Sequence, residues 1–525
     1  MDDKLLDYRT KKILIFLMII IFVFILYFPS SIVRELHYRD EMRYVEVARE
    51  MKVNDSWLIP YFAGEVYTDK PPFYFIILKF MYSIFKTYQT WVFTLPGIFS
   101  SAVISIITFL MAKNKDFKNG IIAFLILISN ILFCAMAVVV RMDMMMAALI
   151  TVSLYCFYLA YFKNKGIRYY YGFFSFSAFA VWIKGPAGFL IPFVTVFAFY
   201  MLDKNNANWS KFPLLKGSIT FIVILLLWLL PAFWIGGQEY MYKLLIVQTF
   251  GRAVDAFDHQ QPFHYYFQLF PLSFLPWTFV LLTAVFKDLR NFRKIKGEKL
   301  FFYTWLLSPL ILFSFFSSKL IIYTLPIIPA AALISAGYLT DNIVKVNKIN
   351  TAVILSIAVY LPFIFIPGQI ENFDLSSLLF GKIIIVLAVI ILLIFYKNKK
   401  LSLSIFIIPF LFFIIFLNFS LGVLPSVSDN YAKKDIALKI KKLVEKGEVK
   451  DVLSFQFGES QSFAIYTDFF IEDIDGKKNI NKYLERKGKL LLFAKKIEWQ
   501  ELTTEIKNKF SEIYEQNEYI LLIEK

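Results

Sequence analysis

The chain has 525 residues, of which 58% are hydrophobic and 18% are charged, and its formal net charge at pH 7 is +16. The mean hydropathy is +0.61. These values exclude a water-soluble globular protein and predict a polytopic α-helical membrane protein.

Apolar segments of about 17 to 25 residues recur along most of the chain, each long enough to cross a hydrocarbon core of roughly 30 Å. The first follows Lys11 and Lys12, and no small-residue cleavage site comes after it, so we expect a retained helix. The two cysteines, Cys134 and Cys156, lie inside apolar segments and predict no disulfide framework. About thirteen transmembrane helices are predicted, at residues 13–29, 91–112, 120–139, 143–162, 169–183, 186–202, 217–235, 263–286, 300–316, 319–340, 350–367, 379–396 and 401–421.

The loops between these segments alternate in their content of lysine and arginine. By the positive-inside rule the lysine-rich loops and the N-terminus lie in the cytoplasm. The first loop, residues 30–90, then lies on the outer face of the plasma membrane. Within it, the apolar segment 72–85 is short and does not fit this alternation as a crossing, so we expect a half-inserted or interfacial helix. The basic loops are 113–115, 163–165, 204–216, 287–299, 345–348 and 397–400.

The composition changes at about residue 425. Short apolar runs there alternate with amphipathic stretches rich in lysine and glutamate, a pattern that predicts a small α/β domain. We therefore expect a transmembrane domain at 1–424 and an extracytoplasmic α/β domain at 425–525. The lysines of this domain are explained by a solvated surface, so we expect no nucleic-acid partner.

Ionisable residues gather at the outer ends of the predicted helices. Any one of them taken alone is more often a solvated or snorkelling side chain than a functional group. Their common side of the membrane is what favours a functional site. They are Asp40, Glu41, Arg43, Asp69, Lys70, Arg141, Asp143, Lys184, Arg252, His259, His264 and Lys319.

This set of residue types suits the transfer of a sugar from a lipid phosphate. A carboxylate can take the proton from an acceptor hydroxyl, while lysine and arginine neutralise the phosphate that leaves. The polyprenyl tail of such a donor would lie in the bilayer, among membrane lipids, with its phosphate at the outer interface. The sequence contains no GxxxxGK[ST] phosphate loop, which agrees with a donor that is not a nucleotide sugar.

Several motifs are spread over residues 30–330. In chain order they are Arg39-Asp40-Glu41-Met42-Arg43-Tyr44, Asp69-Lys70-Pro71-Pro72, Arg141-Met142-Asp143-Met144, Trp182-Ile183-Lys184-Gly185-Pro186, His259-Gln260-Gln261-Pro262-Phe263, Leu275-Pro276-Trp277 and Ser318-Lys319-Leu320. Together they resemble the lipid A aminoarabinose transferase family, which is related to the protein O-mannosyltransferases within the GT-C glycosyltransferase superfamily. The C-terminal domain resembles the family only in type and position.

The resemblance implies a role for each matching residue. Asp40 would be the main catalytic carboxylate and Asp143 a second acidic residue facing the same cavity. Lys70 would hold the donor phosphate, and the further basic residues expected to contact that phosphate are Arg43, Lys184, Lys319 and Arg252.

The resemblance also raises the question of a metal cofactor. The family's metal-binding position before the lysine is usually Glu, and here it is Asp69, a shorter side chain. Asp69 and His259 form the candidate pair for a divalent ion, either zinc or magnesium or manganese.

The sequence thus predicts an integral membrane glycosyltransferase of the plasma (inner) membrane. It would move an aminoarabinose- or mannose-type sugar from a polyprenyl-phosphate donor to lipid A, another cell-envelope glycan or a protein. One alternative is a secondary transporter or lipid flippase, which predicts charges near mid-membrane, broken helices and inverted repeats. The other is a non-catalytic polytopic partner, favoured if Asp40 could be replaced without loss of function.

Overall fold

The computed structural model describes residues 2–37, 40–203, 209–251, 260–342, 383, 404–425, 428, 433–458, 460–474, 489–516 and 519–525. The chain forms two compact units, which we describe separately. Unit 1 comprises Met1–Ser31, Thr68–Tyr74 and Thr94–Val423, and unit 2 comprises Ile32–Tyr67, Phe75–Phe93 and Leu424–Lys525.

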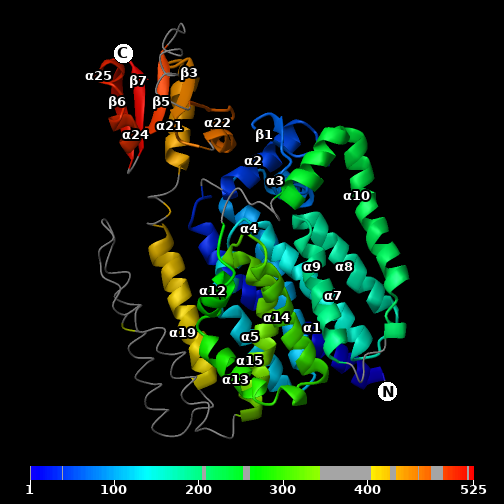
Figure 1. Ribbon diagram of the computed structural model, residues 1–525. Helices are drawn as coiled ribbons and strands as arrows, with labels where there is room; N and C mark the ends of the chain where they lie inside the picture. The colour runs from blue at the N-terminus through cyan, green and yellow to red at the C-terminus, as the bar shows by residue number, and fades with distance from the viewer. Residues whose placement is uncertain are drawn as a thin grey trace. The chain divides into compact units, whose positions relative to one another are not determined.

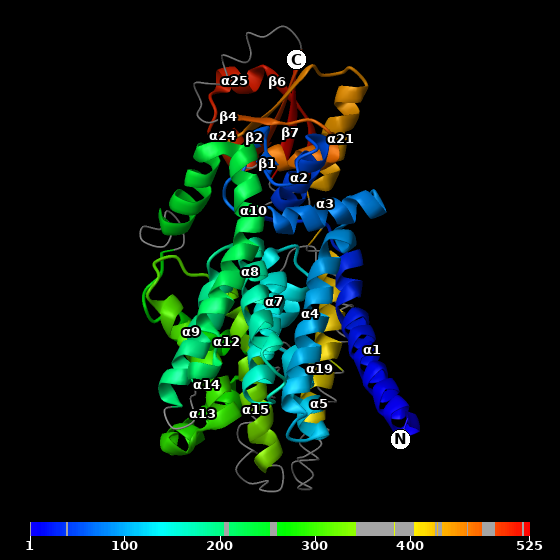
Figure 2. The ribbon, with the colours of Figure 1, turned by 90° about the vertical axis from the view of Figure 1, so that its right-hand side faces the viewer.

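Unit 1 is a bundle of apolar helices, among which α7, α8 and α9 lie side by side (Figure 1). Helices α4 and α7 run in roughly the same direction (Figure 2). The longer helical segments are α1 (Asp2–Ile32), α4 (Thr90–Ala112), α5 (Phe117–Ile128), α6 (Ile131–Ala137), α7 (Met142–Tyr161), α8 (Arg168–Lys184), α9 (Ala187–Leu202), α10 (Leu214–Tyr242), α12 (Tyr265–Ser273), α13 (Thr278–Leu289), α14 (Gly297–Ser314), α15 (Ile328–Asn342) and α19 (Ser404–Asn418). Shorter 3₁₀ or π segments are η1 (Trp209–Lys211), η2 (Lys243–Gly251), η3 (Phe292–Lys294), η4 (Ile321–Ile327) and η6 (Phe419–Val423).

Helices occupy every predicted membrane segment that falls within the described residues. The predicted segments 350–367 and 379–396 lie outside them, apart from residue 383. Among the described helices, six are long and apolar enough to cross a membrane, or seven if the bent pair α5 and α6 is one span. The remaining predicted segments are covered by shorter helices or by pairs of helices.

Three predicted segments are broken rather than continuous. The pair α5 and α6 bends by 68°, and the Asn130 side chain there accepts a hydrogen bond from the Phe133 N–H, which caps the new helix. The segment 263–286 divides into α12 and α13 around Pro276, a residue with no N–H for a helical hydrogen bond. The segment 319–340 begins as the 3₁₀ turn η4 before α15.

Small residues let the helices around α8 approach closely. A Cβ atom on Gly188 would lie 2.4 Å from the Ala180 backbone, and one on Gly217 would lie 2.0 Å from the Phe174 ring. The Ser153 and Ser177 hydroxyls join α7 to α8 with a separation of 2.9 Å. Such close contacts and buried polar pairs hold apolar helices together where the hydrophobic effect alone cannot.

In unit 2 the C-terminal residues form the predicted α/β domain. Its sheet has the order β4-β3-β5-β7-β6, with β3 parallel to β4 and β5, and β7 antiparallel to β5 and β6. The elements are α21 (Lys434–Glu445), β3 (Asp451–Phe455), η7 (Ser460–Phe463), α22 (Ala464–Thr467), β4 (Glu472–Ile474), β5 (Leu490–Lys495), α24 (Lys496–Gln500), α25 (Thr504–Asn508), β6 (Phe510–Gln516) and β7 (Tyr519–Glu524).

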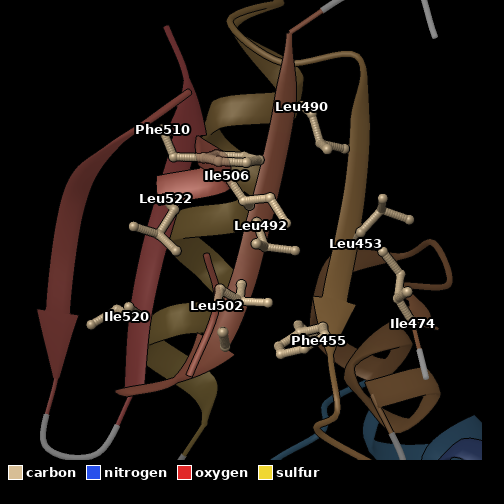
Figure 3. Packing of buried hydrophobic residues seen from close by; sticks show 11 residues of the cluster. Leu453, Phe455, Ile474, Leu490, Leu492, Leu502, Ile506, Phe510, Ile520 and Leu522 are labelled. Atoms are coloured by element: carbon tan, nitrogen blue, oxygen red, sulfur yellow. The ribbon is translucent and has the colours of Figure 1, made fainter. Parts of the chain in front are cut away.

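Alternate residues of the central strands cover one face of this sheet. Leu453 and Phe455 of β3 and Leu490 and Leu492 of β5 point to the same side, as the two-residue period of a strand requires. Leu502, between the short helices α24 and α25, and Ile506 of α25 pack against these strand residues (Figure 3). This cluster gives the domain a hydrophobic core of its own.

Unit 2 also contains most of the first loop. That loop folds as α2 (Asp40–Val53), the hairpin β1 (Tyr61–Phe62) and β2 (Glu65–Val66), and most of α3 (Phe73–Phe85). Helix α3 has 13 residues, about 20 Å at 1.5 Å per residue, and is too short to cross a bilayer. The division of the chain at residues 424 and 425 stays a prediction, while the packing groups the first loop with the C-terminal residues.

Candidate active site

A buried ion cluster lies where α7 begins and α8 ends. The two helices are antiparallel neighbours, so Asp143 in the first turn of α7 meets Lys184, the last residue of α8. The Asp143 carboxylate forms an ion pair with Lys184 through one oxygen and contacts the Arg141 Nε at 3.3 Å through the other. Its side chain is only 1% exposed. The two cations and one carboxylate leave one net positive charge in a desolvated place, where charges act strongly.

Two further side chains of unit 1 come from η4 and from the residues just before it. The Tyr323 ring lies against the Lys184 ammonium, 4.5 Å from Nζ to the ring centroid. Lys319, just before η4, is buried, and its Nζ donates a 2.7 Å hydrogen bond to the Gln261 carbonyl. Residues 260 and 318 form an antiparallel bridge, which holds this part of the chain beside Lys319. The predicted basic residues Lys184 and Lys319 are therefore both in ordered, polar surroundings.

Asp40 is the first residue of α2, in unit 2. Its Oδ1 accepts a 2.5 Å contact from Arg43 one turn later, and the two side chains are 32% and 24% exposed. A carboxylate in the first turn of a helix is stabilised by the helix dipole. The predicted catalytic carboxylate and its neighbouring arginine are thus held at the exposed start of a helix.

The adjacent Glu41 is buried in a tighter pair. Arg34 donates to both Glu41 oxygens, at 2.6 and 2.7 Å, and the His37 N–H donates to the same carboxylate at 2.8 Å. Bidentate pairing of this kind gives geometric specificity as well as energy. It anchors the start of α2, next to Asp40.

A second buried pair lies in the middle of α2. Arg49 donates to both Glu46 oxygens, at 2.8 and 2.7 Å. Burial raises the pKa of the Glu46 carboxyl to about 7, and Glu50 adds to the rise, although Arg49 acts in the opposite direction. Glu50 in turn accepts hydrogen bonds from the N–H groups of Ala63 and Gly64 in the hairpin turn.

The remaining predicted site residues are placed only in part. Asp69 and Lys70 are half-buried in the bend before α3, whereas Arg252 and His259 lie outside the described residues. Across the described part of the chain, no group of three or more His, Cys, Asp and Glu side chains could hold a metal ion. The Asp69 and His259 pair therefore stays a prediction.

Sequence reasoning missed three contacts described above: Glu46 with Arg49, Glu41 with Arg34, and Lys184 with Tyr323. Glu46 and Arg49 stand at a spacing of three on a helix, the available signal for their pairing. Arg34 lies seven residues before Glu41, and Tyr323 lies far from Lys184 along the chain, so neither contact has a signal in local sequence.

Comparisons with known proteins agree with the sequence motifs. Residues 12–247 match the family model of dolichyl-phosphate-mannose-protein mannosyltransferases. An uncharacterized protein of Aquifex aeolicus is 27% identical over 440 residues, covering 83% of each chain. The undecaprenyl phosphate-alpha-4-amino-4-deoxy-L-arabinose arabinosyl transferase of Yersinia pestis is 27% identical over 62% of this chain, and the match spans 59% of the Yersinia protein.

Two solved structures share the fold. The crystal structure of ArnT from Cupriavidus metallidurans bound to undecaprenyl phosphate is similar with a TM-score of 0.77 and 16% identity, covering 98% of both chains. The oligosaccharyltransferase AglB of Archaeoglobus fulgidus is similar with a TM-score of 0.55 and 13% identity, covering 91% of this chain and 69% of its own. The predicted GT-C fold class and the resemblance to the aminoarabinose transferase and protein mannosyltransferase families are confirmed.

Proposed function

We propose that this chain, which has the fold of the aminoarabinose transferases, is an integral membrane glycosyltransferase that uses a polyprenyl-phosphate-linked sugar. The observation that carries the proposal is the buried cluster of Asp143, Lys184 and Arg141, whose net positive charge suits a phosphate. The related Yersinia enzymes are named for a donor of undecaprenyl phosphate and 4-amino-4-deoxy-L-arabinose. A polyprenyl phosphate bearing a sugar of this kind is the donor we expect.

The reaction is a displacement at the anomeric carbon. An acceptor oxygen bonds to that carbon, the bond from carbon to the phosphate oxygen breaks, and polyprenyl phosphate leaves with the bonding pair. Lys70, Lys184 and Lys319 would neutralise the charge that grows on the phosphate, with Arg43 and Arg252 as further contacts. This direct displacement inverts the anomeric centre.

The two carboxylates receive different tasks. Asp40 is partly exposed and takes the proton from an acceptor hydroxyl. Asp143 already contacts two cations, so its task is to hold Lys184 and Arg141 in place. If the acceptor is itself a phosphate, little base strength is needed, and Asp40 orients the acceptor.

The proposal also covers the acceptor, the orientation of the chain in the membrane and a divalent metal cofactor. The acceptor is lipid A, another cell-envelope glycan or a protein at the outer face of the plasma membrane. The N-terminus is cytoplasmic, and the C-terminal domain is extracytoplasmic. A divalent ion at Asp69 and His259 is tested by measuring transfer after chelation and after return of zinc, magnesium or manganese separately.

The test is transfer of labelled sugar from polyprenyl-phosphate donors into cell-envelope fractions. Asp40→Asn and Lys70→Ala, made at equal abundance, are each expected to lower transfer about 100-fold. Glu65→Gln is the matched control, because Glu65 is an exposed carboxylate of the same loop. Transfer that persists in Asp40→Asn would remove Asp40 from the mechanism, and an intact protein that transfers from no polyprenyl phosphate donor would overturn the proposal.

A further inference from the structure

The helix that carries Asp40 contacts residues from the far end of the chain. Glu35, in the segment that leads into α2, donates its backbone N–H to the Ser428 hydroxyl at 2.8 Å. The Glu35 carboxylate accepts a 2.8 Å contact from Lys434, at the start of α21. Glu35 therefore uses both backbone and side chain to contact residues 393 and 399 positions later in the chain.

A buried tyrosine of the C-terminal domain lies against the same region. Tyr466 belongs to α22, which packs against both α2 and α21. Its side chain is 7% exposed, and its hydroxyl has no hydrogen-bond partner among the described residues. Burial raises the pKa of Tyr466, and the nearby carboxylates of Glu35 and Glu41 raise it further. The ring is therefore packed beside the charged start of α2.

The other end of α2 has an anchor from a different element. Lys79 of α3 donates to the carbonyls of Met51 and Ser56, at 3.2 and 3.1 Å. Its ammonium also lies 3.8 Å from the Trp57 ring centroid. Met51 is in the last turn of α2, where carbonyls have no partner within the helix and a nearby cation is favourable, and Ser56 lies just beyond that helix. Helix α2 is thus held by α3 at its C-terminal end and by the C-terminal domain near Asp40.

We infer that the C-terminal domain positions the catalytic helix α2, with Lys434 and Tyr466 as positioning residues that act through Glu35 and the start of that helix. The inference rests on the proposed role of Asp40. Placement of a reacting group within about 1 Å can change a rate by roughly 100-fold, so a contact that adds little to overall stability can still matter for transfer. The C-terminal domain would then be part of the transferase and not a separate module.

The test reverses the charge on each side of the contact. Lys434→Glu and Glu35→Lys are each expected to lower kcat about tenfold with little change in KM for the donor, and the double exchange is expected to restore most of the loss. Lys442→Glu makes the same charge change at an exposed position of α21 and is expected to behave like the intact protein. Hydrogen exchange of the α2 amides gives a readout independent of activity, and it should be faster in the two single variants than in the double exchange.

Tyr466→Phe separates positioning from substrate contact. This variant keeps the packed ring and removes a hydroxyl that has no partner among the described residues, so transfer should stay within about twofold of the intact protein. A loss as large as that of Asp40→Asn would make Tyr466 a substrate contact and overturn the positioning role. Unchanged kcat and unchanged exchange in Lys434→Glu would overturn the inference as well. If the intact protein transfers no sugar, the proposed function fails, and the exchange data alone then decide whether the domain orders α2.

Discussion

At the scale of single residues, each unit holds a buried carboxylate that is paired with arginine or lysine. Asp143 is paired with two cations in unit 1, and Glu46 is paired with one arginine in unit 2. Removing one partner of a buried pair leaves a charge without compensation, whereas removing both partners is often tolerated. This asymmetry allows stability and catalysis to be tested separately.

Replacing Lys184 by Met should affect both stability and transfer. Loss of one partner of a buried ion pair costs roughly 3–5 kcal/mol, and we expect the lower end because Arg141 remains beside Asp143. The double variant Lys184→Met with Asp143→Asn should recover part of the thermal midpoint of the purified protein, because only the 20% exposed Arg141 then lacks its carboxylate. Transfer should stay about 100-fold lower. Recovery of transfer in the double variant would show that Lys184 serves only to balance Asp143.

Replacing Glu46 by Gln should change how stability depends on pH. The carboxyl has an ordinary pKa of 4.5 and a pKa of about 7 in the folded protein. Between these values the folded state binds more protons than the unfolded state, so the stability contributed by this group is present below about pH 4.5 and is lost as the pH rises towards 7. The difference is at most about 3 kcal/mol.

Thermal unfolding measured from about pH 5 to pH 8 checks this prediction. The intact protein and the Glu65→Gln control should lose stability with rising pH across this range, and Glu46→Gln should lose less. The same groups face Glu46 in every case, namely Arg49, Glu50 and Tyr88. An unchanged slope in Glu46→Gln would mean that another group dominates the pH dependence.

At the scale of elements, the crossing of α8 and α9 depends on one glycine. Because a Cβ on Gly188 would lie 2.4 Å from the Ala180 backbone, Gly188→Ala should force the helices apart and lower the thermal midpoint. Gly337→Ala in α15 is the matched control, since a Cβ there meets nothing within 4 Å and alanine favours a helix by roughly 0.5–1 kcal/mol. Equal midpoints for the two variants would show that the α8 and α9 contact is not tight.

The sequence predicted the places of most elements but not their breaks or their packing. Hydrophobicity predicted the ends of α4 and α7 to within a few residues. A long apolar run with few charges forms a helix in a bilayer, because its backbone polar groups must bond to one another there. The bend at Asn130 and the 3₁₀ turn η4 depend on side-chain caps and prolines inside apolar runs, which hydropathy does not register. Strand β6 was not recognised, because the polar residues Ser511, Glu512, Glu515 and Gln516 interrupt its apolar side chains and leave no short apolar run.

The candidate site was predicted in its residues more than in its contacts. The motifs around Asp143 and Lys184 were recognised separately, and the antiparallel pairing of α7 and α8 brings them together. The same motifs gave no signal for the link from Glu35 to Lys434, because contacts between residues so far apart along the chain follow from the fold. Local sequence therefore identified the groups that suit the chemistry, and tertiary packing decides which of them can act together.

At the scale of the whole molecule, the proposed chemistry requires the first loop and the C-terminal domain to face the same side of the membrane. The grouping of Ile32–Tyr67 with Leu424–Lys525 in one compact unit supports this requirement, since segments that pack together in one unit lie on the same side of a bilayer. The alternation of lysine-rich loops predicts that this side is the outer one.

Labelling with a membrane-impermeant thiol reagent tests this orientation directly. The native cysteines, Cys134 and Cys156, are buried and should react little. Cysteines introduced as Gln89→Cys in the first loop and Glu505→Cys in the C-terminal domain should react in intact cells, because both positions are exposed. Lys165→Cys, between α7 and α8, should react only after the membrane is permeabilised. Labelling of Lys165→Cys in intact cells together with protection of Glu505→Cys would reverse the orientation, and a donor phosphate at the outer interface could then no longer meet Asp40.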